Sequence, residues 1–231
     1  MKKKNKFFKK NYGKSWKYLK ESKNFIYASL IIFFLFVFIG AFFPVPEIFR
    51  ERILEYIQRL LEMTEGMSRG ELISFIFLNN LQSSFFAMIF GIGLGIFSAT
   101  TSILNGYVLG FVSSEAVYGG GILVLWRLLP HGIFELPALF ISTGLGLKLG
   151  LPFVYRYFKY YWKKRNNLAL LTGVLFLPFA IILTLIFEKN LRKYQLKDFL
   201  FKINNSLRIF ISVIFPFLLI AAIIEGILIS F

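Results

Sequence analysis

Apolar runs alternate with charged stretches along the whole chain. Six of these runs have roughly the 20 residues that a helix needs to cross a bilayer. Lipid offers the backbone no hydrogen-bond partners, so each run is expected to be a helix, and no alternating ten-residue pattern indicates a β-barrel. The pattern predicts an all-α, polytopic transmembrane helical bundle with spans at residues 26–43, 75–98, 103–118, 133–150, 168–187 and 207–231.

Basic residues set the expected orientation of the spans. Ten lysines lie within the first 24 residues, and such segments stay in the cytoplasm. Residues 1–25 are therefore predicted to be a basic cytoplasmic N-terminus, and residues 26–231 a single transmembrane domain in the plasma membrane. Residues 155–165 carry five Lys/Arg and no acid, and four crossings return them to the cytoplasm as the rule requires. Residues 188–206 carry five Lys/Arg and two acids, yet six spans place them outside.

Three further segments have patterns that allow two interpretations. In residues 47–63, apolar side chains recur at helical spacing with charged residues on the opposite face, and residues 190–205 do so less cleanly. Each predicts either an interfacial amphipathic helix or a docking face for a protein partner. The apolar run in residues 119–131 begins with three glycines and is too short to cross. It predicts either a broken, re-entrant helix or an apolar outer loop.

Composition narrows the classes of function. The chain has no cysteine, which excludes disulfides, thiolate metal sites and cysteine nucleophiles. A formal net charge of +15 would suggest a nucleic-acid partner in a soluble protein, but here the lysines and arginines flank apolar segments. Membrane topology and the anionic headgroups of a lipid bilayer explain this charge better, so no nucleic-acid partner is expected.

Ionisable residues gather around the start of the fourth predicted span. Arg127, His131 and Glu135 lie within nine residues of one another. His131 and Glu135 are four positions apart, so they share one face of a helix. A pair between them, with Arg127 as a further partner, would lower the cost of burying their charges. Lys148, at the other end of the same span, is expected to extend to the membrane interface.

Several chemistries were weighed for this group. A metal site needs more ligands than one histidine and one carboxylate, and the chain lacks both the HExxH of metalloproteases and the paired Glu of glutamyl-type intramembrane proteases. A proton relay needs only His131 and Glu135, and a structural network that joins helices needs nothing further. We expect no cofactor, no metal and no enzymatic activity. The predicted intramembrane polar network comprises Asn79, Asn80, Asn105, Arg127, His131, Glu135 and Glu225.

Three GxxxG pairs lie on consecutive spans. Such pairs let two helix backbones approach closely. Their positions favour a tight central bundle of the second, third and fourth spans, and formation of a homo-oligomer is an alternative use of one pair. The glycines expected to pack helices are Gly91, Gly95, Gly106, Gly110, Gly146 and Gly150.

At these positions the chain resembles the stage II sporulation protein M family of multi-pass membrane proteins. The matching stretches are "NNLQSSFFAMIFGIGLGIFS", "LNGYVLG", "LPHGIFELPALFISTGLGLKLG" and "AAIIEGIL". The resemblance is concentrated in residues 79–150, and "PHGIFELPA" is its most specific part. The family's polar signature falls on Asn79, Asn80, Asn105, Gly106, Pro130, His131, Gly132, Glu135, Pro137 and Glu225, and no catalytic role comes with it.

The resemblance implies a plasma-membrane protein without known catalytic activity. The namesake works with two cell-wall-degrading partners as their membrane anchor or scaffold. We therefore expect a non-enzymatic integral membrane scaffold that organises membrane or envelope protein partners in membrane or cell-envelope remodelling. The alternative is a transporter or permease subunit that uses Glu135 and His131 as a proton or substrate site.

Overall fold

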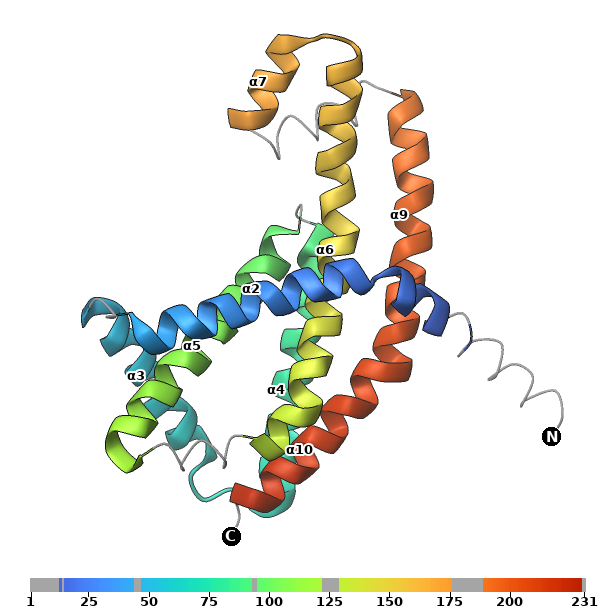
Figure 1. The fold of residues 1–231 in the computed structure, drawn as a ribbon. Coiled ribbons are helices and arrows are strands. Elements are labelled where there is room, and N and C mark those ends of the chain that lie inside the picture. The colour runs from blue at the N-terminus through green and yellow to red at the C-terminus, as the bar shows by residue number, and fades with distance from the viewer. Residues whose placement is uncertain are drawn as a thin grey trace, which may run out of the picture.

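The computed structural model describes residues 13, 15–43, 47–92, 95–121, 129–175 and 189–229. Across these ranges the chain is helical, without a strand, and the predicted all-α fold is confirmed (Figure 1). A short helical segment, residues 15–21, precedes the numbered elements. These elements are α2 (Lys23–Phe42), α3 (Glu47–Thr64), α4 (Arg69–Ile89), the 3-10 turn η1 (Phe90–Ile92), α5 (Ile96–Gly120), α6 (Leu129–Lys163), α7 (Asn167–Leu175), α9 (Lys189–Ile209), the π-helical turn η3 (Phe210–Ile214) and α10 (Phe215–Ile229).

Five helical stretches in the described part of the chain are long and apolar enough to cross a membrane. Each overlaps one of the predicted spans. Of the sixth predicted span, residues 168–187, only the beginning is described, as α7, and the remainder lies outside the described residues. The five stretches are Lys23–Phe42, Arg69–Ile89, Ile96–Gly120, Gly132–Lys163 and Leu196–Leu228.

Helix α6 is the centre of the bundle. Every residue from 138 to 150 is buried, and α6 packs against α2, α4, α5 and α10. At 35 residues it is about 50 Å long, so it extends well beyond the ~30 Å that a bilayer core requires. The predicted span 133–150 covers only the membrane-sized part of α6, because hydropathy falls where the helix continues into the basic residues 155–163.

The last span is part of a longer helix than the sequence suggested. Helix α9, the turn η3 and α10 run without interruption from Lys189 to Ile229. Residues 190–205, which were expected to form a separate interfacial segment, are therefore continuous with the apolar α10. The π-helical turn at their junction adds one residue to a helical turn and so rotates the polar α9 face relative to α10.

Helices α2 and α5 run parallel and in register. Ser29 contacts Ser102, Phe33 contacts Gly106 and Val37 contacts Gly110, and each pair is separated by 73 positions. A Cβ atom on Gly106 would lie 2.3 Å from the Phe33 carbonyl oxygen, and one on Gly110 would lie 2.1 Å from that of Val37. Only glycine permits this backbone contact, which brings two spans as close as helices can pack.

Substitution of Gly106 by Ala should therefore destabilise the bundle. The added methyl group meets main-chain atoms of α2, which cannot move aside as a flexible side chain can, so α2 and α5 must separate. We expect the variant to lose about 1–3 kcal/mol of stability, measured as a lower melting temperature in detergent. Gly119→Ala is the matched control on the same helix, because a Cβ there has open space, and it should not lower the melting temperature. Equal losses for both variants would contradict the close contact.

Candidate functional site

A chain of buried hydroxyl groups joins three helices next to the α2–α5 contact. Ser29 of α2 lies 3.0 Å from Ser102 of α5 and also hydrogen-bonds to Thr143 of α6. Thr143 in turn donates to the Leu139 carbonyl oxygen at 2.7 Å. If Ser102 donates to Ser29 and Ser29 to Thr143, each hydroxyl has both a donor and an acceptor partner. These fully satisfied groups fix helix positions, because a buried polar group without a partner would be costly.

Ser98 extends this connection to a fourth helix. Its hydroxyl donates to the Ala87 carbonyl oxygen of α4 at 2.6 Å, and it also lies beside Gly146 of α6. Ser98, Ser102 and the two glycines that follow them recur every four residues, so they form one buried stripe along α5. The hydroxyl groups of this stripe accept from or donate to other hydroxyls and main-chain carbonyls. Such partners do not activate a nucleophile, so the arrangement serves packing.

Lys148 is buried below the N-terminal segment. Its residue is only 8% exposed, and its amine lies 3.6 Å from the centre of the Tyr18 ring. The amine donates to the Ser22 hydroxyl at 2.9 Å, and Ser22 donates to the Tyr18 carbonyl oxygen at 2.7 Å. The expectation that Lys148 extends to the interface is therefore wrong, since residues 15–22 fold over the amine and offer it a ring face and a hydroxyl.

An ionic cluster lies beside this buried lysine. Asp198 of α9 binds Arg156 of α6 and Lys202 of its own helix, each at 2.8 Å. The Tyr18 hydroxyl is buried next to Ser206, and burial raises the pKa of its phenol to about 12. Tyr18 is therefore neutral at physiological pH and acts as an aromatic surface for the cation. The cluster joins residues 15–22 to both α6 and α9.

The predicted polar residues are only partly brought together. Glu135 of α6 and Glu225 of α10 are half-buried, and their carboxyl groups interact electrostatically. Asn105 is exposed and donates to the Thr101 carbonyl oxygen of its own helix, at 2.8 Å. Asn79 is exposed and Asn80 half-buried on α4. Arg127 and the side chain of His131 lie outside the described residues.

The predicted packing glycines lie at three different contacts. A Cβ on Gly91 would lie 2.4 Å from the Cα of Gly146, so η1 and α6 touch through their backbones. Gly95 adopts a left-handed conformation, with φ +78°, and precedes α5 as its N-cap. Gly150 is buried on α6. Gly106 and Gly110 pack against the first span, α2, and not against the second and fourth spans that the sequence had suggested.

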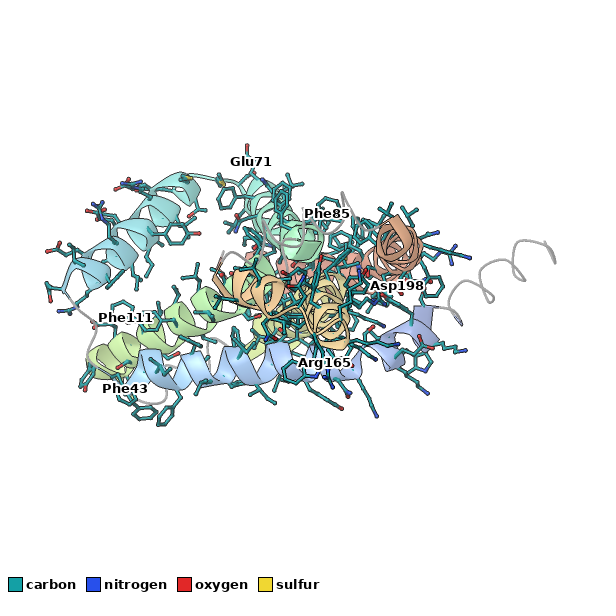
Figure 2. All side chains as sticks on the ribbon, turned by 90° about the horizontal axis from the view of Figure 1, so that it is seen from above. Phe43, Glu71, Phe85, Phe111, Arg165 and Asp198 are labelled. Carbon is teal, nitrogen blue, oxygen red and sulfur yellow. The ribbon has the colours of Figure 1, made fainter. Side chains whose placement is uncertain are left out.

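A cleft of about 540 Å³ lies at the opposite end of the molecule from Asp198. Figure 2 shows Phe43 and Phe111 at this end, where α2, α5 and α3 meet. Arg50 of α3 binds Glu115 of α5 there at 3.3 Å and so ties α3 to the bundle. Among the described residues, no group of three or more His, Cys, Asp or Glu side chains could hold a metal ion.

Sequence reasoning missed the groups that hold the interior together. The four-residue recurrence of Ser98, Ser102, Gly106 and Gly110 was visible in the sequence, but only its two glycines were recognised. Small hydroxyl residues serve the same purpose as glycine in membrane helices, and this rule would have extended the stripe. The contact between Lys148 and Tyr18 had no sequence signal, because it depends on the direction in which residues 15–22 leave α2.

The fold and these polar contacts define a polytopic α-helical membrane protein with a close-packed interior. The family described as Stage II sporulation protein M matches residues 29–228, and the chain belongs to this family. The chain is also 27% identical, over 168 residues, to an uncharacterized protein of Methanocaldococcus jannaschii. This match covers 68% of the chain and 75% of the relative. No solved structure gives a significant match.

Replacement of Lys148 by Met should release the N-terminal segment. Met keeps the apolar stem but removes the ring contact and the hydrogen bond, which together contribute about 2 kcal/mol. Tryptic cleavage after Lys17 and Lys20, followed by mass spectrometry in detergent, should become at least about tenfold faster. Lys159→Met, at an exposed position of the same helix, is the control and should leave the cleavage rate unchanged. Unchanged cleavage in Lys148→Met would show that the buried amine does not hold the segment.

Proposed function

We propose that the protein is a non-enzymatic scaffold of the plasma membrane, with its N-terminus in the cytoplasm, that organises protein partners in membrane or cell-envelope remodelling. Membership of the Stage II sporulation protein M family supports this proposal and does not favour the transport alternative. The interior supports it as well. Ser29, Ser102 and Thr143 satisfy one another, which suits a fixed framework better than a moving carrier.

The observation that carries the proposal is the amphipathic helix α3. None of its residues is buried, although it is fixed to the bundle through Arg50 and Glu115. Phe49 and Leu61 are 61% and 65% exposed, so α3 presents apolar side chains that the bundle does not cover. A helix that is held in place but leaves its apolar face uncovered is suited to bind the groove or helix of another membrane or envelope protein.

The proposal predicts that partner binding depends on the apolar face of α3. In the variant Phe49→Ser/Leu54→Ser/Leu61→Ser, proteins that co-purify with the wild type from native membranes should fall at least about tenfold, because the anchoring side chains are gone. The control Arg52→Ser/Gln58→Ser/Glu62→Ser changes exposed polar positions of the same helix and should keep the same partners. Both variants should keep the wild-type melting temperature, since α3 buries no residue.

Two outcomes would count against the scaffold. One is the absence of any stable protein partner across several detergents. The other is that the same partners remain bound to the variant with the altered apolar face, which would show that α3 lies only on lipid. Quantitative mass spectrometry of the purified complexes measures both outcomes.

A further inference from the structure

Helix α6 and the helix formed by α9 and α10 are antiparallel along their whole length. The Phe134 ring of α6 lies 6.0 Å from that of Phe217, and the Phe153 ring lies 6.0 Å from that of Phe199. Between these contacts, Ile141 and Leu145 pack in one core with residues 209–218. As the residue number rises along α6, the number of its partner falls. The start of α9 therefore lies beside the end of α6, as Figure 1 also shows.

This neighbourhood limits how often the intervening chain can cross the membrane. Arg156 of α6 binds Asp198 of α9, so both helix ends lie at one face of the bundle. A connection that leaves and returns at the same face crosses an even number of times. Residues 164–188 reach only about 38 Å as a helix, whereas two crossings of a ~30 Å core need about 60 Å. Zero is the only even number that this length allows.

We infer that the chain crosses the membrane five times, with no crossing between α6 and α9. The N-terminus, residues 155–165 and the start of α9 then share one side, and the end of α10 lies on the other. This topology is independent of the proposed function. It agrees with the five helical stretches of membrane length in the described residues, and it differs from the six-span topology expected from hydropathy.

The distribution of charge supports this inference. With five crossings, all three basic segments lie on the N-terminal side: residues 1–25, 155–165 and 188–206. The connection from residue 44 to 72, with four Arg and six Glu, lies on the opposite side. Cytoplasmic segments are rich in Lys and Arg, so the conflict that residues 188–206 posed for six spans disappears.

Helix α7 shows how the apolar connection begins. The Tyr157 hydroxyl donates to the Ala169 carbonyl oxygen at 2.5 Å, and Gly173 lies against the same ring. As α7 proceeds from Asn167, it therefore folds back along α6 and away from its tip at Lys163. Its exposed Leu168 and Leu171 are carried toward the membrane side of the bundle from the cytoplasmic face. Apolar composition alone does not distinguish such a return from a full crossing.

The five-crossing topology also assigns the two ends of the bundle. Glu225 lies near the outer end of α10, beside Glu135, and not at a cytoplasmic interface. The ionic cluster of Arg156 and Asp198 lies at the cytoplasmic end. A partner that binds α3 thus meets the molecule outside, where the α10 terminus also lies, while the basic end of α6 faces the anionic cytoplasmic leaflet.

Single-cysteine labelling tests this topology, because the chain contains no native cysteine. A membrane-impermeant maleimide should label Glu65→Cys and Ser230→Cys in intact cells. Asn166→Cys and Lys197→Cys should be labelled only after permeabilisation. The positions Glu65, Asn166 and Lys197 are exposed, so these variants should keep the wild-type melting temperature. Labelling of Lys197→Cys in intact cells would overturn the inference.

Fusions at the C-terminus give a second, independent result. Alkaline phosphatase fused after Phe231 should be active, because it folds only outside the cytoplasm, and a cytoplasm-dependent green fluorescent protein at the same place should stay dark. The reverse pair of results would restore an even number of crossings. Loss of partner binding by α3 variants leaves both assays unchanged, so failure of the scaffold proposal and failure of the topology are distinguishable.

Discussion

The backbone contact between α2 and α5 is the constraint on which the rest of the structure depends. Lipid tails are as apolar as leucine, so spans do not associate through the hydrophobic effect and need close packing instead. Gly106 and Gly110 allow the carbonyl groups of Phe33 and Val37 to approach the α5 backbone. That approach brings Ser29 to Ser102, and the same hydroxyl reaches Thr143 of α6. One pair of parallel helices thereby positions the central helix.

Helix α6 passes this order to the two ends of the molecule. At one end Lys148 and Arg156 gather residues 15–22 and α9 into a cytoplasmic cluster. At the other end Glu135 meets Glu225, and the ion pair of Arg50 with Glu115 fixes α3 beside the outer cleft. The interior is satisfied by hydrogen bonds within the protein, whereas α3 leaves its apolar face uncovered. Rigid inside and exposed at its outer edge, the molecule is built as a platform for other proteins.

Hydropathy and glycine spacing predicted the all-α fold and many of the packing positions, because both are properties of single helices. They did not predict partners. Gly106 and Gly110 face α2, and Asn105 bonds within its own helix, since the direction of a face depends on neighbours that periodicity does not identify. Residues 168–187 have the length and hydropathy of a span, and only the antiparallel contact of α6 with α9 indicates that the chain returns to the same side.

The in-register contact of α2 with α5 can be measured directly in the cysteine-free chain. Ser29→Cys/Ser102→Cys places two thiols where the native hydroxyl oxygens are 3.0 Å apart. Mild oxidation in native membranes should cross-link most molecules and block later thiol labelling. Ser29→Cys/Asn105→Cys, with the second thiol on an exposed face of α5, should cross-link far more slowly. No cross-link in the first pair, or equal rates in both, would contradict the α2–α5 packing on which the structure depends.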